Sequence, residues 1–161
     1  IETGDREGIR FVQGKLNVGE TMAPPLIRQV KSRIEPNSVA ILDAPPGTSC
    51  PMVTAVRGSD FCILVTEPTP FGMNDLHLAI ETVKKLGIPY GVVVNRAEAD
   101  DLKTRDYFKS NQIPLLLKIP LDRKIAELYS IGTPFIGPMP EYREKFRALF
   151  KTISETVRVS S

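Results

Sequence analysis

The chain has 161 residues, 42% of them hydrophobic and 25% charged, which suits a single folded domain and excludes disordered, collagen-like and coiled-coil classes. Its 21 basic and 19 acidic residues nearly balance, so the charge gives no argument for nucleic acid or a membrane surface as partner. No apolar run approaches the roughly 20 residues that span a bilayer. Two cysteines and no apolar leader favour a reducing, cytoplasmic setting.

Predicted helices and strands alternate along the chain. A first helix is expected from Pro24 to about Ile34, with paired prolines in its first turn. Four short apolar runs without polar alternation indicate buried parallel strands: Val39–Leu42, Phe61–Val65, Tyr90–Val94 and Leu115–Ile119. Helical spacing predicts helices over 74–86, 102–110 and 122–132, and a last one from 140 onward. Gly87 is expected to end the first of these, and Asp122 to cap the third. This order predicts one α/β domain over 1–161, an open, doubly wound, mostly parallel sheet with helices on both faces.

Ligands of such sheets bind beyond the carboxyl ends of the strands, so the residues after each predicted strand are the candidates for a site. These segments are Asp43–Thr48, Thr66–Thr69, Asn95–Arg96 and Pro120–Asp122. We expect the four of them to converge.

Asp43 places a carboxylate directly after the carboxyl end of the first predicted strand, where such a group can hold Mg²⁺ through water. Pro45, Pro46 and Gly47 then form a stiff turn whose glycine allows the backbone to approach an anion such as a phosphate. The simpler interpretation is a buried strand followed by an acidic helix cap.

Four strings in these segments resemble the MinD/ParA-like P-loop ATPases, in particular the branch with an inserted ferredoxin domain. They are Asp43-Ala-Pro-Pro-Gly-Thr-Ser-Cys-Pro51, Val65-Thr-Glu-Pro-Thr-Pro-Phe-Gly72, Val93-Val-Asn-Arg96 and Ile119-Pro-Leu-Asp122. The resemblance covers nearly the whole chain, and the first string is its most specific part. It implies a partial P-loop NTPase fold that binds ATP and Mg²⁺.

The same resemblance implies a role for particular residues. Asp43 would be the catalytic carboxylate that serves Mg²⁺ through water, and Gly47 with Thr48 would contact the γ-phosphate. In the adenine pocket, Asn95 would read the base edge with one amide donor and one acceptor, beside Arg96. The segment from Pro120 to Asp122 would lie beside the base.

The family's glycine-rich phosphate loop is missing from the 161 residues. The stretch from Gly8 to Lys15 is a near miss, with the wrong spacing and no Ser or Thr after the lysine. The cysteine clusters of a ferredoxin domain are missing too. We therefore expect the chain to be the C-terminal portion of a longer parent ATPase and to be inactive alone. The parent is expected to be a homodimer linked to an iron–sulfur or electron-transfer partner.

Five residues have competing interpretations. Cys50 stands at an offset from Asp43 that, by resemblance to the nitrogenase iron protein, suggests an iron–sulfur ligand shared between subunits; a plain packed or weakly reactive thiol is the alternative. Cys62 is expected inside a strand as a small buried side chain. His77, with no partner at ligand spacing, is expected on a solvated helix face. Arg96 and Glu67 could serve the site or simply close a loop.

Two other functions compete with an ATPase. A non-catalytic α/β interaction module would keep the sheet without binding nucleotide. A flavodoxin-like or dinucleotide-binding domain is disfavoured, because no G-x-G-x-x-G string follows a predicted strand.

Overall fold

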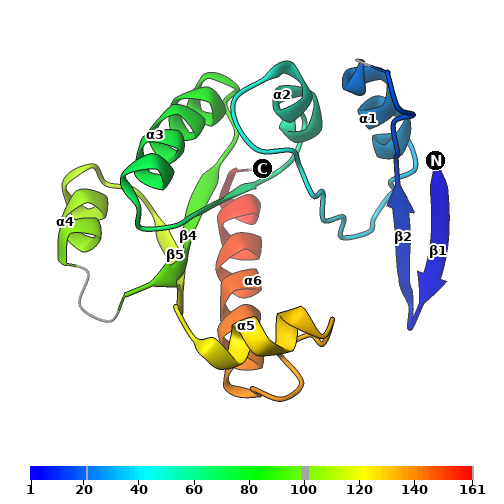
Figure 1. Ribbon diagram of the computed structural model, residues 1–161. Helices are drawn as coiled ribbons and strands as arrows, with labels where there is room; N and C mark the ends of the chain where they lie inside the picture. The colour runs from blue at the N-terminus through cyan, green and yellow to red at the C-terminus, as the bar shows by residue number, and fades with distance from the viewer. Residues whose placement is uncertain (21, 99–101, 161) are drawn as a thin grey trace. The chain divides into compact units, whose positions relative to one another are not determined.

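A computed structural model gives the structure of the chain and describes residues 1–20, 22–98 and 102–160. The chain forms two compact units, Ile1–Gly58 (unit 1) and Ser59–Ser161 (unit 2). Figure 1 shows the helices and strands of both.

Unit 1 combines a β-hairpin with two helices. Strands β1 (Glu2–Arg6) and β2 (Ile9–Gln13) pair antiparallel around Glu7 and Gly8, whose positive φ angles of 52° and 78° suit the tight turns that join hairpin strands. Helix α1 (Ala23–Lys31) carries proline in its first turn, as the sequence predicts, and it contacts α2 (Cys50–Val56). The hairpin and α2 were not predicted.

The predicted strand Val39–Leu42 is wrong. These residues have no strand geometry, and Val39 and Ile41 are 73% and 93% exposed. An apolar run becomes a strand only when a neighbouring strand accepts its backbone hydrogen bonds, and this run pairs with none of the strands that the structure describes. Asp43 consequently follows an irregular segment here.

Unit 2 contains a three-stranded parallel sheet flanked by helices, which confirms the predicted α/β class. Three strands, β3 (Cys62–Thr66), β4 (Tyr90–Ala97) and β5 (Leu115–Pro120), lie in the order β3-β4-β5, with β4 in the centre. The helices of this unit are α3 (Pro70–Lys85), α4 (Leu102–Ser110), α5 (Arg123–Ser130) and α6 (Glu141–Ser160). In Figure 1, α3 and α4 lie on one side of the sheet and α6 on the other.

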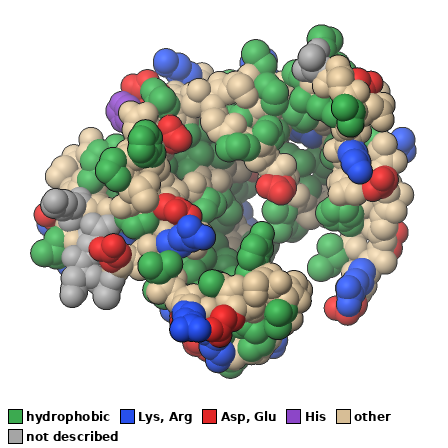
Figure 2. All heavy atoms as spheres, viewed as in Figure 1, with side chains coloured by type: hydrophobic (Ala, Val, Ile, Leu, Met, Phe, Trp, Pro, Cys, Tyr) green, Lys and Arg blue, Asp and Glu red, His purple; other side chains and the backbone are tan. Residues whose placement is uncertain are grey.

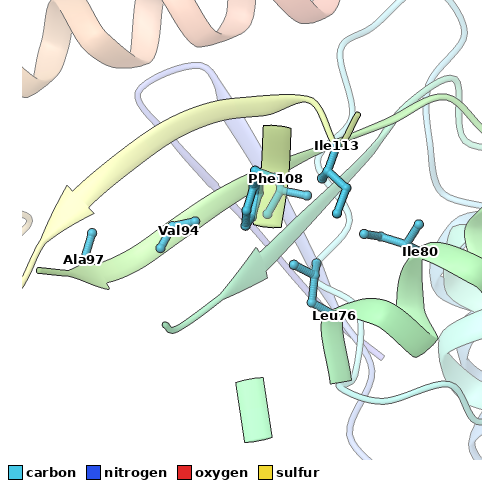
Figure 3. Packing of buried hydrophobic residues seen from close by; sticks show 7 residues of the cluster. Leu76, Ile80, Val94, Ala97, Phe108 and Ile113 are labelled. Carbon is cyan, nitrogen blue, oxygen red and sulfur yellow. The ribbon is translucent and has the colours of Figure 1, made fainter. Parts of the chain in front are cut away.

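The core of unit 2 forms where β4 meets α3 and α4. Leu76 and Ile80 from α3 and Phe108 from α4 pack with Val92 and Val94 of the central strand, and the two valines have no exposed surface. Figure 3 shows labelled members of this cluster converging from the three elements, together with Ile113, which precedes β5. The sheet is thereby fixed from one side, which holds its carboxyl edge in place.

No helix within the described ranges joins the length and apolarity that a bilayer crossing requires. On the face seen in Figure 2, hydrophobic side chains are scattered among charged ones.

Candidate functional site

Three of the four predicted segments meet at the carboxyl edge of the sheet in unit 2. Thr66 at the end of β3 pairs with Val94, and Ala97 at the end of β4 pairs with Pro120 at the end of β5. The backbone N–H of Leu121 donates to the carbonyl of Ala97 at 3.1 Å. The predicted convergence is therefore confirmed for the segments that follow β3, β4 and β5, and we call this place the strand-end edge.

Asn95 and Arg96 form a β-bulge on the central strand. Val94 pairs with Lys118 and Ala97 with Pro120, so these two residues of β4 oppose Ile119 alone. Regular alternation would turn Arg96 to the face of Val92 and Val94, whereas the extra residue puts Ala97 into that apolar cluster instead. The bulge keeps the guanidinium out of the core.

In this bulge, Arg96 adopts a left-handed backbone conformation with φ +52°. That conformation costs a residue with a Cβ about 1–2 kcal/mol. Its Nη1 lies 3.5 Å from Oε1 of Glu67, which follows β3, and the two side chains are 63% and 41% exposed. An ion pair this exposed contributes at most about 1 kcal/mol to stability. Its clearer effect is to link the bulge to the end of the neighbouring strand.

The loop that carries Glu67 is closed by hydrogen bonds. The hydroxyl of Thr66 donates to the carbonyl of Gly72 at 2.8 Å, and the Gly72 N–H donates to the hydroxyl of Thr69 at 3.0 Å, which caps α3. A Cβ on Gly72 would collide with the carbonyl oxygen of Glu67. Glycine at this position therefore lets the loop fold tightly against the start of α3.

Asp122 caps α5, as the sequence predicts. Its Oδ1 accepts a hydrogen bond of 2.7 Å from the backbone N–H of Lys124. Tyr142 on α6 is 3% exposed, and burial raises the pKa of its phenol, with smaller contributions from the charges of Asp122 and Glu141. Pro120 ends β5 and is exposed. Both predicted residues of this segment thus lie at the strand-end edge.

Asp43, Gly47 and Thr48 belong to unit 1, and all three are exposed. Gly47 has φ +84°, a conformation that favours glycine, and a Cβ built there would meet nothing within 4 Å. The turn therefore has the open backbone expected of an anion contact. Whether it joins the strand-end edge, and whether Asp43 holds a metal, stay predictions.

The two thiols differ in environment. Cys50 begins α2 and is exposed, whereas Cys62 begins β3 and is 8% exposed, which confirms it as a buried strand residue. Burial raises the pKa of the Cys62 thiol. Among the residues that the structure describes, no three His, Cys, Asp or Glu side chains are grouped to hold a metal. One exposed thiol does not fit the four ligands of an iron–sulfur cluster within a single chain.

His77 lies exposed on α3, as predicted, but the expectation that it has no acidic partner is wrong. Its Nε2 is 3.6 Å from Oε1 of Glu81, one helical turn later. The i,i+4 spacing in the sequence would have shown this pair.

Comparison with known proteins supports the resemblance seen in the sequence. No protein-family model matches the chain. An uncharacterised protein of Methanocaldococcus jannaschii is 37% identical over 128 residues, covering 78% of this chain and 44% of that protein. The iron–sulfur cluster carrier protein of Deinococcus radiodurans is 31% identical over 137 residues, covering 74% of this chain and 38% of that protein.

A solved structure has the same fold. The MinD cell division protein of Aquifex aeolicus superposes with a TM-score of 0.59 at 20% identity, covering 83% of this chain and 58% of that one. The chain spans about half or less of the length of the two curated relatives named above.

Proposed function

We propose that this chain, a relative of the MinD/ParA-like P-loop ATPases, supplies part of an ATP site: the Mg²⁺-binding Asp43, the switch loop (the segment from Asp43 to Pro51) and the adenine pocket. One observation carries the proposal. The bulged Asn95–Arg96 step and the Pro120–Asp122 segment lie together at the strand-end edge, the place where parallel α/β sheets bind ligands.

The adenine pocket consists of residues from the ends of β4 and β5. The carboxamide of Asn95 offers one acceptor and one donor group, which match the amino group and N1 of adenine. Asn95 is half-buried, so water competes less for these hydrogen bonds than at an open surface. Pro120 supplies an apolar surface beside the base, and the cap at Asp122 fixes the segment that follows it.

Asp43, Gly47 and Thr48 are the proposed residues for the metal and the terminal phosphate. Mg²⁺ prefers oxygen ligands and retains water, and the exposed carboxylate of Asp43 suits both preferences. When bound, Mg²⁺ would neutralise the charge that develops on the phosphate oxygens. The open backbone at Gly47 would let main-chain N–H groups approach the γ-phosphate. Asp43 is the residue on which hydrolysis would depend most.

Residues 1–161 form, in this proposal, one α/β domain that is the C-terminal portion of the ATPase domain of a longer parent. Because the glycine-rich phosphate loop is missing from these residues, the chain alone binds ATP weakly and does not hydrolyse it. The relatives extend well beyond the matched region, which leaves room for that loop in the parent.

A link to iron–sulfur chemistry in the cytoplasm is proposed from two relatives: the iron–sulfur cluster carrier protein of Deinococcus radiodurans and the cytosolic Fe-S cluster assembly factor Nubp2 homolog of Anopheles gambiae, which is 26% identical over 134 residues. The parent would act as a homodimer, in which two copies of Cys50 would supply two of the four thiols that a shared cluster takes. The chain by itself does not fit a cluster, so that role depends on the dimer.

A non-catalytic interaction module remains the second candidate. It is favoured by one observation, the missing phosphate loop.

Isothermal titration with Mg-ATP separates the two candidates. The chain alone should bind weakly, and the full-length parent should bind at least a hundredfold more tightly, because the phosphate loop adds several charged hydrogen bonds. If the full-length parent does not bind Mg-ATP, the non-catalytic interaction module is the candidate that remains. Submicromolar binding by the chain alone would point to a nucleotide site of another kind.

A further inference from the structure

We infer that Lys31 is a positioning residue for the switch loop: its ammonium holds the carboxyl end of α2, and α2 fixes the point where the loop ends. This inference rests on the proposed function, because it assumes that the loop contacts the γ-phosphate. Lys31 itself lies on α1 and belongs to no segment of the proposed ATP site. The contacts that carry the inference all lie within unit 1.

Lys31 caps α2 from a neighbouring helix. Its Nζ donates to the carbonyls of Ala55 at 2.7 Å, Arg57 at 2.6 Å and Thr54 at 3.3 Å. An ammonium has three N–H donors, so these three acceptors match all of them. Carbonyls at the end of a helix lack intrahelical partners, and a positive charge is favourable there.

Helix α2 depends on such a cap because it is short. It has seven residues, and isolated helices of fewer than about 12–15 residues are marginal in water. Its N-cap, Ser49, forms no side-chain cap hydrogen bond within the described residues. Its first turn has no acidic side chain and its last turn no basic one. The charge that suits the carboxyl end of α2 therefore comes from Lys31 on α1.

The switch loop continues directly into α2. Cys50 belongs to both, since it lies near the end of the loop and begins the helix. The N–H of Val53 donates to the carbonyl of Ser49 at 3.1 Å, and the hydroxyl of Thr54 donates to the carbonyl of Cys50 at 2.7 Å. Thr54 thus contacts Lys31 through its carbonyl and the end of the loop through its hydroxyl. A displacement of α2 would move Ser49 and Cys50 with it.

Helix α1 is a firm support for Lys31. A Cβ on Gly14, directly after β2, would lie 2.7 Å from Cγ of Leu26 and 2.9 Å from Cγ2 of Val30. Glycine allows the backbone there to pack closely against α1. Lys31 therefore extends from a helix that is packed on the hairpin.

The position of the loop should affect hydrolysis more than the binding of ADP. Gly47 and Thr48 would contact the γ-phosphate, which ADP lacks. A misplacement of about 1 Å at groups that act in the transition state can cost about a hundredfold in rate. Loosening α2 should therefore slow turnover and leave ADP affinity nearly constant.

The test uses the full-length parent, with turnover measured by phosphate release and ADP binding by calorimetric titration. Lys31→Met removes the donors and keeps the apolar stem, Lys31→Gln keeps an uncharged donor, and Lys31→Arg keeps the charge. Lys85→Met is the matched control, because Lys85 is also a lysine in the last turn of a helix, α3.

Turnover should fall about tenfold in Lys31→Met, about threefold in Lys31→Gln, and less than about twofold in Lys31→Arg and Lys85→Met. Every variant should bind ADP at one site per chain, with an affinity within about twofold of the unsubstituted parent. Full ADP stoichiometry would show that the slow variants are folded. If Lys31→Met does not fold, Lys31→Gln decides.

Unchanged turnover in Lys31→Gln and Lys31→Met would overturn the inference alone. A fall in turnover matched by an equal fall in ADP stoichiometry would do the same, because it reports only a loss of folded protein. Turnover as slow in Lys31→Arg as in Lys31→Met would show that the cation is not the cause. An unsubstituted parent that neither hydrolyses ATP nor binds ADP would overturn the proposed function and this inference with it.

Discussion

The ammonium of Lys31, the last residue of α1, donates a 2.7 Å hydrogen bond to the carbonyl of Ala55 in α2. The same Nζ reaches the carbonyls of Thr54 at 3.3 Å and Arg57 at 2.6 Å. These groups are acceptors at the end of a helix, where carbonyls lack intrahelical partners and a positive charge is favourable. Burial lowers the pKa of Lys31 by disfavouring its charged form. The hydrogen bonds to the three carbonyls favour the charged form.

Replacing Lys31 by methionine should loosen α2. The variant retains the apolar stem but removes the donors, and the expected loss is about 1–2 kcal/mol. Amide hydrogen exchange along α2 measures this locally and should become faster. Lys85→Met, at the exposed end of α3, is the control and should leave α2 unaffected. Unchanged exchange in Lys31→Met would show that the three contacts add nothing.

Gly72→Ala should destabilise unit 2. Alanine favours a helix over glycine by about 1 kcal/mol, but its Cβ would collide with the backbone oxygen of Glu67, which cannot move without reshaping the loop. We expect a net loss of about 1–3 kcal/mol, measured by urea denaturation. Gly137→Ala is the matched control, because its nearest neighbour would lie at an ordinary 3.8 Å. Greater stability in Gly72→Ala would mean that the loop opens easily.

The two thiols should react at different rates with iodoacetamide. Cys50 is exposed and should react readily at pH 8, whereas Cys62 is shielded and its raised pKa leaves less thiolate. Because its folded pKa lies above the unfolded one, Cys62 favours folding below the unfolded pKa and loses that contribution as pH rises. Each of the variants Cys50→Ser and Cys62→Ser leaves one thiol, whose alkylation rate is measured by mass spectrometry. Equal rates would contradict the buried position of Cys62.

Much of unit 2 could be predicted from sequence because its elements repeat simple patterns. Apolar runs of about five residues located β3, β4 and β5, and Asp122 and Gly87 marked a helix start and a helix end. The bulge at Asn95 could not be predicted, since it shows only in the pairing with β5. The turn residues Glu7 and Gly8 were the available signal for the hairpin.

The failure at Val39–Leu42 and the omission of α2 have separate physical causes. Hydrophobicity shows that a segment favours burial, but not that a neighbouring strand is present to pair with it. Helix α2 was not predicted, although Pro51 suits the first turn of a helix, where it lies here. The roles of Asp43, Gly47 and Thr48 depend on a ligand, so neither pattern nor fold decides them.

Hydrolysis by Asp43→Asn in the full-length parent is the most direct test of the proposed ATPase. The change removes the charge that would hold Mg²⁺ with little change in shape, and metal charge matters most in the transition state. We predict that turnover falls at least a hundredfold while ATP affinity changes less than tenfold, measured by phosphate release and titration. An unchanged rate would contradict the account and leave Asp43 as a loop residue without a catalytic role.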